Sequence, residues 1–405
     1  MAERYYPQIE DVHLPPGKYI LVLPGWYPTW QDPFTGDFNQ RHVRAAGIHM
    51  PQVVLYISKD QTQKLTKTET RYNQLTENII EIIVIYPQKN DKWFDTVYSN
   101  LIYLRLLYYY ARIIKKKWGK PLLIHSYIVI RGGLGGMLLG KKWKISFILS
   151  EHWTIYYPED PGYLQRRNLL FRWTVKKIFE KAKLFLPVTK SLQQQVSALF
   201  KPLPSAIIPN VVETKFFHYK EDDVKENGFR FVHVSNMVDQ KNPKGLLRGF
   251  KRFIEIHTGS CLWMVGPYPE AIWEYAASIN LSDDAVHFTG PVSYQAVAEI
   301  LRLSKALVMF SHYENLPCVI LESLCCGLPV ISTNVGGIAE VIDVYNGILI
   351  NSGDEEQLTA AFIKMVTLYK NYDRKSISDS ATNLFSYHAV GSLFYSAYNT
   401  VKTIH

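Results

Sequence analysis

The chain has 405 residues, a length typical of two or three domains, and its 47% hydrophobic and 20% charged side chains exclude a disordered protein. The formal net charge of +9 is concentrated in residues 101–183, where 17 lysines and arginines stand against four acids. Four cysteines lack metal-ligand spacing, the first residues do not resemble a secretory signal, and no apolar run is long enough to span a membrane. We therefore expect a cytoplasmic protein without a membrane-spanning helix.

Short runs rich in β-branched residues alternate with helical segments along most of the chain, which predicts an α/β protein with two doubly wound, Rossmann-like parallel sheets. In the first half, strands are expected at 19–23, 52–57, 79–86, 122–126, 145–150 and 184–188. Helices are expected between them at 37–49, 99–118, 130–141, 164–183 and 191–200. The polar stretch from 59 to 78 is expected to be a mobile loop.

The second half repeats the alternation. Its expected strands lie at 229–234, 261–265, 286–288, 306–310 and 329–332, and its expected helices at 244–257, 270–279, 294–303 and 317–326. The segment 206–214 is expected to form the hinge between the two sheets. Ligands of open α/β sheets bind at the carboxyl ends of the strands, so two such sheets that face each other predict a cleft lined by the loops after the strands.

The segment 313–323 carries the clearest functional signal. Pro317 suits the first position of a helix because its φ is fixed and it has no N–H, and Gly327 is a typical helix end. The free N–H groups of Cys318 and Val319 would then point out of the helix start. Such a terminus binds phosphate through its donors and its dipole.

Two carboxylates bracket this phosphate position, since Glu314 lies just before the helix and Glu322 on its second turn. Each carboxylate can accept hydrogen bonds from hydroxyls, and a nucleoside-diphosphate sugar has hydroxyls on both sides of its diphosphate. With the Gly-Leu-Pro-Val and Gly-Gly-x-x-Glu segments inside 327–341, the arrangement resembles the donor-site signature of retaining glycosyltransferase family 4. The alternative is a buried amphipathic helix with two incidental glutamates.

This resemblance implies the GT-B fold, with two Rossmann-like domains facing across a cleft. Residues 1–208 would form the acceptor-side domain, 209–386 the nucleotide-sugar donor domain, and 387–405 a last helix that crosses back to the first. The implied reaction moves a hexose from a nucleoside-diphosphate sugar to an acceptor hydroxyl with retention, without a cofactor or a metal. A GT-B sugar-nucleotide epimerase and a catalytically inactive partner subunit are the alternatives.

Two loops of the first half match positions of the family that lie near the donor. Gly36 and Asp37 end the loop after the first strand, which would lie against the diphosphate and the acceptor. His152 follows the strand at 145–150, where the family places a histidine close to the transferred sugar. An imidazole there can bind a sugar hydroxyl or help the acceptor hydroxyl lose its proton. The alternatives are a plain surface turn and a structural histidine.

The loop after the first strand of the second half departs from the family. Lys241 matches a lysine that neutralises the leaving diphosphate, but Asn236 stands where an arginine is usual. Arg41 and Arg131 are candidates to supply the missing charge. We name His152, Glu314 and Lys241 as the catalytic candidates.

The other donor-binding candidates lie around the same expected cleft. Gly290 and Val292 resemble a turn whose backbone contacts the nucleobase, and Asn315 replaces a glycine, a change that bears on sugar selectivity. The full set of donor-binding candidates is Gly36, Asp37, Asn236, Lys241, Gly290, Val292, Glu314, Asn315, Leu316, Pro317, Cys318, Val319 and Glu322.

The segment 108–118 interleaves cations with aromatic side chains. Such a patch gains about 1 kcal/mol per basic residue near an anionic lipid surface. The alternative is an ordinary solvated helix face, and no nucleic-acid-binding motif accompanies the charge. The patch favours a lipid-linked saccharide or nascent surface polysaccharide as acceptor, and a protein that is peripheral at the inner face of the membrane.

Overall fold

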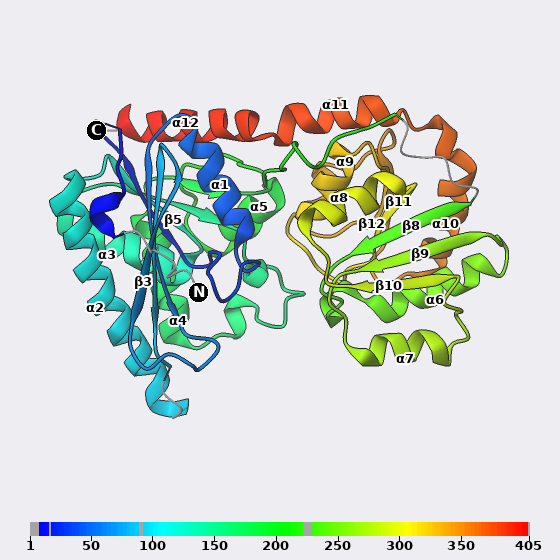
Figure 1. Ribbon diagram of the computed structural model, residues 1–405, viewed down its shortest axis with the longest axis horizontal. Coiled ribbons are helices and arrows are strands. Elements are labelled where there is room, and N and C mark those ends of the chain that lie inside the picture. Colours follow the sequence, from blue (N-terminus) through cyan, green and yellow to red (C-terminus); the bar gives the residue numbers. More distant parts are fainter. Residues whose placement is uncertain (1–7, 16–17, 89–91, 222–227, 404–405) are drawn as a thin grey trace, which may run out of the picture.

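The computed structural model describes residues 8–15, 18–88, 92–221 and 228–403, and it consists of two α/β halves side by side (Figure 1). The first half is built on a seven-stranded sheet with the order β3-β4-β2-β1-β5-β6-β7. Its strands are β1 (Ile20–Pro24), β2 (Gln52–Lys59), β3 (Glu69–Thr76), β4 (Ile79–Tyr86), β5 (Leu123–Tyr127), β6 (Phe147–Glu151) and β7 (Phe185–Pro187). The predicted α/β class is confirmed.

The prediction of a loop from 59 to 78 is wrong, because residues 69–76 form β3, which pairs antiparallel with β4. In this pairing Arg71 lies opposite Ile83. β3 has no buried residue, whereas every residue of β4 is buried. A polar edge strand lacks the apolar alternation from which strands are predicted, and this explains the error.

The helices of the first half cover both faces of its sheet. They are α1 (Asp37–Gly47), α2 (Lys92–Trp118), α3 (Leu134–Trp143), α4 (Leu169–Lys181) and α5 (Lys190–Leu199). The helix expected at 130–141 starts late, because Ile130 has an extended ψ of 145° and Arg131 a positive φ of 59°. The helix expected at 164–183 is a single turn, Leu164–Arg166, followed by α4.

The second half is built on a six-stranded parallel sheet with the order β10-β9-β8-β11-β12-β13. Its strands are β8 (Phe229–Val234), β9 (Ser260–Val265), β10 (Val286–Gly290), β11 (Ala306–Met309), β12 (Val330–Thr333) and β13 (Gly347–Ile350). Its helices are α6 (Pro243–Ile254), α7 (Glu270–Ser278), α8 (Tyr294–Leu303), α9 (Cys318–Cys325), α10 (Glu355–Leu368) and α11 (Arg374–Phe385). β11 and β12 are buried throughout, as expected for parallel strands covered on both faces.

The last helix, α12 (Tyr387–Thr403), packs against α1 of the first half (Figure 1). Val390 and Phe394 join the core around β1 and β2, and the hydroxyl of Tyr398 lies 2.9 Å from Nδ1 of His125. A Cβ on Gly391 would lie 2.5 Å from the carbonyl oxygen of Ala45, so close approach of the two helices requires glycine there. The last helix therefore packs on the half that contains β1 and α1.

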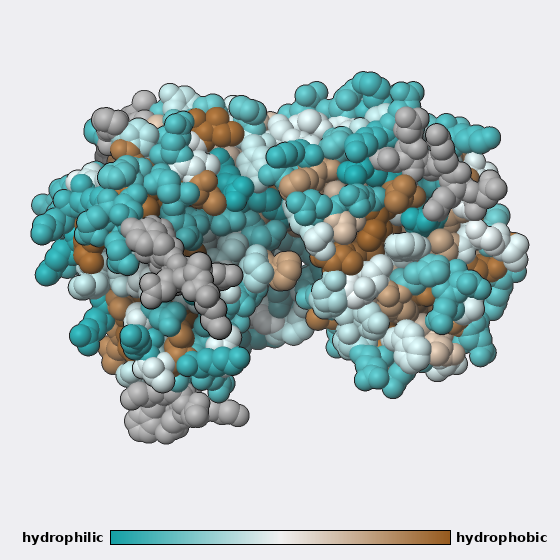
Figure 2. All heavy atoms as spheres, in the orientation of Figure 1, coloured by the Kyte–Doolittle hydropathy of each residue, from teal (hydrophilic) through white to brown (hydrophobic). Residues whose placement is uncertain are grey.

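The loops that follow the strands of the two sheets meet between the halves, where the surface is hollowed (Figure 2). This is the edge at which open α/β sheets bind ligands. Within the described residues, no helix has both the length and the apolar character required to cross a bilayer.

Candidate active site

The start of α9 lies in a pocket between the two halves. The helix begins at Cys318 rather than at the expected Pro317, because Pro317 has a ψ of 126° and is therefore the N-cap residue. No side chain caps this end, and among the described residues the N–H groups of Cys318 and Val319 have no acceptor. Gly327 follows the helix with a φ of 69°, as its predicted role as a helix end requires.

This pocket, called the interdomain pocket below, has a volume of about 280 Å³ and is lined by both halves. The lining residues from 1–210 are Trp26, Phe38, His152, Trp153, Thr154, Val188 and Asn210, and those from the second half are Gln240, Glu314, Asn315, Leu316, Pro317 and Cys318. Six of the predicted site residues thus meet there although they come from segments far apart in the chain.

Lys241 reaches the pocket through an ion pair with Glu314. Its ammonium group donates to Oε1 of Glu314, and only 17% and 7% of the two side chains are exposed. Lys241 belongs to a short turn after β8, Asp239–Lys241, whereas Glu314 follows β11. The pairing places one cation and one anion beside the open start of α9.

Glu322 is held by an arginine of the other half. Nη1 of Arg41, on α1, donates to Oε1 of Glu322 at 2.7 Å, and Nη2 donates to Asp37 at 2.9 Å. The hydroxyl of Tyr294 also donates to Oε1 of Glu322, at 2.6 Å. Arg41 is buried, and its Nε has no hydrogen-bond partner among the residues that the structure describes. The structure thus brings Arg41, one of the two cations considered as replacements for the missing arginine, to the helix that begins in the pocket.

His152 is buried in the wall of the interdomain pocket. Its ring centroid lies 4.7 Å from that of Phe38 and 5.0 Å from that of His42. Burial, reinforced by the neighbouring His42, holds the pKa of His152 well below its usual range, so the imidazole is neutral at physiological pH. Within the described part of the chain its Nε2 has no hydrogen-bond partner, which is costly for a buried polar atom unless a ligand supplies one.

Glu151 fixes the loop that carries His152, a role that sequence analysis missed. Its carboxylate accepts hydrogen bonds from the N–H groups of Val129, His152 and Trp153 at 2.9–3.0 Å, and from the hydroxyl of Tyr156 at 2.9 Å. Burial raises the pKa of Glu151, and these four donors act against that rise. The only signal in the sequence is an acid at the end of an otherwise apolar strand.

Asn315 links the two halves rather than facing only the pocket. Its Nδ2 donates to the carbonyl oxygen of His152 at 3.1 Å, and its Oδ1 accepts from the hydroxyl of Thr189 at 3.1 Å. A glycine at this position would make neither bond.

Other predicted residues lie outside the lining of the interdomain pocket. The side chain of Asn236 is exposed, and Gly290 borders a separate hollow beside α7. Val292 is half-buried. Gly36 has a φ of 74° and packs against the backbone of Trp26, so it supports the loop that lines the pocket. Asp37 and Glu322 both pair with Arg41, and Val319 and Glu322 are buried residues of α9.

A second pocket of about 370 Å³, called the side pocket below, adjoins the interdomain pocket and shares Trp26 and Trp153 with it. Arg131 lines the side pocket, together with Tyr56 and Lys59. The backbone before and at Arg131 is strained, since Ile128 and Arg131 have φ values of 66° and 59°. Such strain persists only where the surrounding structure holds it, and it is typical of functional sites.

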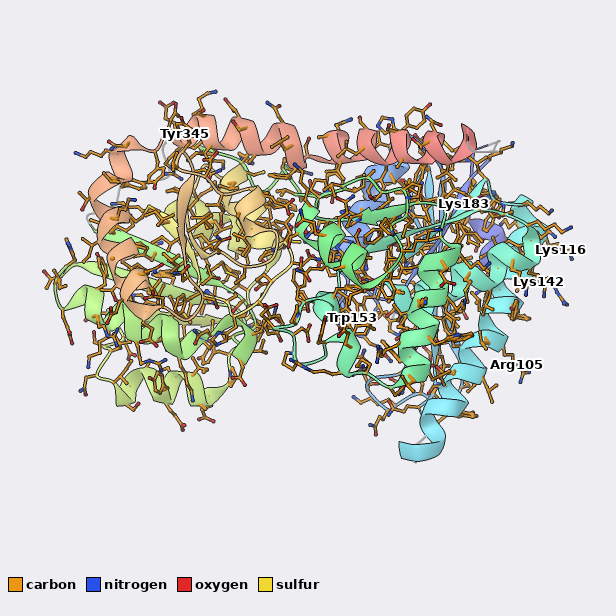
Figure 3. The ribbon with its side chains drawn as sticks, turned by 180° about the vertical axis from the view of Figure 1, so that it is seen from behind. Arg105, Lys116, Lys142, Trp153, Lys183 and Tyr345 are labelled. Atoms are coloured by element: carbon orange, nitrogen blue, oxygen red, sulfur yellow. The ribbon has the colours of Figure 1, made fainter. Side chains whose placement is uncertain are left out.

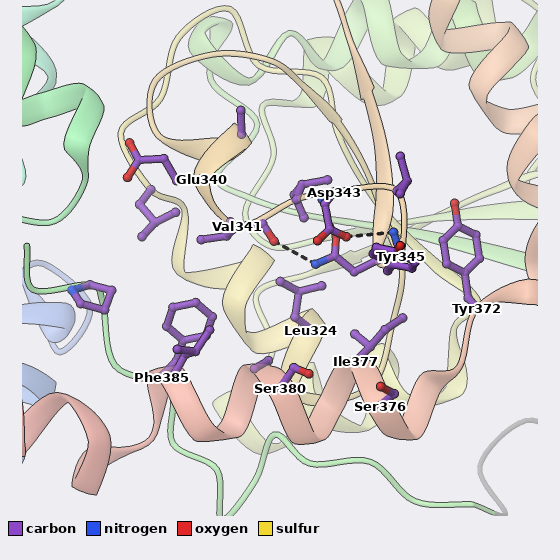
Figure 4. A pocket seen from close by; sticks show the side chains of 18 of the residues that line it. Leu324, Glu340, Val341, Asp343, Tyr345, Tyr372, Ser376, Ile377, Ser380 and Phe385 are labelled. Atoms are coloured by element: carbon purple, nitrogen blue, oxygen red, sulfur yellow. Dashed lines mark hydrogen bonds between the residues drawn. The ribbon is translucent and has the colours of Figure 1, made fainter.

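A larger cavity of about 960 Å³ lies between α9, α11 and the segment 339–346 (Figure 4), and it shares Val188 and Leu316 with the interdomain pocket. Leu324, Val341, Ile377 and Phe385 line it, and of the predicted site residues only Leu316 does so. Its size therefore does not make it the candidate active site.

Residues 215–382 match the family model described as "Glycosyl transferases group 1". The chain is 26% identical over 296 residues to an uncharacterized glycosyltransferase of Methanocaldococcus jannaschii, covering 73% of this chain and 78% of that one. It is 22% identical over 258 residues to an amylovoran biosynthesis glycosyltransferase of Erwinia amylovora, covering 61% and 62%. Residues 215–382 are therefore similar to this family, and the two relatives resemble longer parts of the chain.

Solved structures share the fold. Sucrose-phosphate synthase from Thermosynechococcus elongatus superposes with a TM-score of 0.76 at 15% identity, over 96% of this chain and 100% of that one. Anabaena HepE in complex with UDP-glucose superposes with a TM-score of 0.71 at 13% identity, over 95% and 100%. The expected GT-B fold is confirmed.

Proposed function

From the match of residues 215–382 to glycosyl transferases group 1, we propose that this chain is a retaining glycosyltransferase. It transfers a hexose from a nucleoside-diphosphate sugar to an acceptor hydroxyl. The observation that carries the proposal is the interdomain pocket, where the uncapped start of α9, the Lys241–Glu314 pair and the unpartnered Nε2 of His152 meet.

The diphosphate binds at the start of α9, where the N–H groups of Cys318 and Val319 and the helix dipole favour negative charge. Lys241 adds one cation, and Arg41 adds the second, in place of the arginine that Asn236 replaces. Most of the catalysis then consists of stabilising the leaving diphosphate and fixing the reactants in place. Neither a metal nor a cofactor is needed for that role.

Two carboxylates bind the hydroxyls of the donor. Glu322 binds the ribose. For this contact a ribose hydroxyl must replace Arg41 as a hydrogen-bond donor to Oε1 of Glu322. Glu314 binds hydroxyls of the transferred hexose and is balanced by Lys241. The turn at Gly290 and Val292 contacts the base through its backbone.

His152 acts as a neutral imidazole. Because burial holds its pKa well below the usual range, its Nε2 serves as a partner for a sugar or acceptor hydroxyl and not as a cation. Glu151 keeps the ring in place through the backbone of the same loop.

The acceptor enters through the side pocket. Trp26 and Trp153 line both pockets, so a sugar that stacks on these indoles reaches the donor. We propose a saccharide or lipid-linked saccharide acceptor, as in cell-surface polysaccharide or glycolipid synthesis. The enzyme works in the cytoplasm, peripheral at the inner face of the membrane.

A thermal-shift screen of UDP, GDP, ADP and their sugars tests the donor class, because a ligand that binds the native state raises the melting temperature. Calorimetry with the stabilising nucleotide then compares Lys241→Ala with Lys244→Ala, a control on an exposed lysine of α6. We expect a loss of affinity only for Lys241→Ala. Equal affinities would contradict the assignment, and conversion of the sugar nucleotide without an acceptor would favour an epimerase.

A further inference from the structure

The first turn of α4 exposes three large apolar side chains. Leu169, Leu170 and Trp173 are 79%, 73% and 58% exposed, and they lie within one turn of each other. The later part of the same helix is anchored, since Val175 and Ile178 are fully buried. A single exposed leucine needs no explanation, but a contiguous apolar group on a fixed helix marks an interaction surface.

Arginines surround this apolar group. Arg166 donates to the carbonyl oxygens of Asp160 and Pro158, and the guanidinium of Arg167 lies 5.0 Å from the ring centroid of Phe171. No carboxylate of the described chain pairs with Arg166, Arg167 or Arg172. The surface therefore combines apolar side chains with uncompensated positive charge, which is complementary to an anionic lipid surface.

This surface lies beside the acceptor side of the site. Phe171, in the first turn of α4, makes an edge contact with Trp153 at a centroid distance of 6.4 Å. Trp153 lines both the interdomain pocket and the side pocket. Figure 3 shows Trp153 on the same half as the basic residues Arg105, Lys116, Lys142 and Lys183, with Tyr345 on the other half.

We propose that the first turn of α4 docks on an anionic lipid bilayer. Leu169, Leu170 and Trp173 enter the headgroup boundary, where tryptophan is favoured, and the three arginines contact lipid phosphates. The proposal moves the membrane contact from the expected segment 108–118 to α4. It deepens the proposed function, because a lipid-linked acceptor would present its sugar beside Trp153, but lipid binding itself requires no turnover.

The experiment measures sedimentation of the full chain with vesicles of phosphatidylcholine alone or mixed with phosphatidylglycerol. We expect binding only to the anionic vesicles and weaker binding as salt rises. The double variant Leu169→Ser/Leu170→Ser should bind at least roughly ten-fold more weakly, because two leucine side chains no longer bury apolar surface in the headgroup boundary. The matched control is Val344→Ser/Tyr345→Ser, at side chains that are 81% and 80% exposed on the other half.

A second variant, Arg166→Gln/Arg167→Gln/Arg172→Gln, should reduce both the binding and its salt dependence. Equal binding to neutral vesicles, no binding to anionic vesicles, or no effect of the leucine variant would overturn the proposal. So would a dimer in light scattering that only the leucine variant loses, because this face would then join two copies. Nucleotide binding measured without vesicles tests the proposed function separately, and the leucine variant should retain it.

Discussion

Arg41 of α1 and Glu322 of α9 form an ion pair between the two halves, with Nη1 2.7 Å from Oε1. The two side chains are only 9% and 6% exposed, so both charges have lost most of their water. Removing one partner of such a buried pair is costly, because it leaves the other charge uncompensated. In the proposed function the sugar nucleotide gives each of the two side chains a new partner. Its ribose hydroxyls bind Glu322, and its diphosphate binds Arg41.

The first prediction concerns Arg41→Ala. If Arg41 binds the diphosphate, the variant loses a charge-assisted hydrogen bond worth about 1.5–3 kcal/mol, or roughly a ten- to hundred-fold loss of affinity. Calorimetry with the nucleoside diphosphate measures this loss. Because Asn236 occupies the usual arginine position, Arg41→Ala/Asn236→Arg should recover part of the affinity.

Arg44→Ala is the control for Arg41→Ala, because Arg44 lies on the same helix and makes no ion pair with a described residue. Its nucleotide affinity should equal that of the wild type. A higher affinity in Arg41→Ala would show instead that Arg41 only closes the cleft and competes with the donor.

The second prediction concerns Asn315→Gly, which restores the residue expected from the family. The variant loses the bonds to the carbonyl of His152 and to Thr189, each worth about 1 kcal/mol, and both bonds join the two halves. We expect a lower melting temperature and a larger radius of gyration in small-angle scattering. Asn334→Gly, at an exposed asparagine of the second half, is the control. An unchanged radius would mean that these bonds do not hold the halves together.

The third prediction concerns Glu151→Gln. The glutamine amide presents a donor to N–H groups that need an acceptor, so at least one buried group loses its partner, at a cost of about 1–3 kcal/mol. We expect kcat to fall while the donor KM stays unchanged, since Glu151 holds His152 and does not line the interdomain pocket. A change in donor KM alone, with kcat intact, would argue against this positioning role.

Most of the sheet architecture was predictable, because parallel strands covered on both faces appear as continuous apolar runs. β11 and β12 are such runs, and their bounds were predicted to within one residue. β3 was missed because it lies at the edge of its sheet and buries neither face. The predicted helix 130–141 begins four residues too early because helix propensity carries no information about the positive φ of Arg131.

Those parts of the site were predictable that depend on residues close together in the sequence. The start and end of α9 depend on Pro317 and Gly327, and both are visible in the sequence. The pairing of Arg41 with Glu322 spans 281 positions, and it exists only because α1 of the first half lies against α9 of the second. The anchoring by Glu151 was equally hidden, since three of its four donors are backbone N–H groups, which the residue types of the sequence do not mark.

The last prediction is that the protein loses stability as the pH falls below about 6.5, the usual pKa of histidine. Burial lowers the pKa of His42 and His233 to about 4, and that of His125 and His152 well below the usual range. Between these values the unfolded chain binds protons that the folded protein does not, so each histidine reduces the unfolding free energy by up to about 1.4 kcal/mol per pH unit. Urea unfolding at a series of pH values from 7.5 to 5 measures this slope. His152→Asn should make it shallower by one such contribution, and an unchanged slope would mean that the imidazole titrates normally in the folded protein.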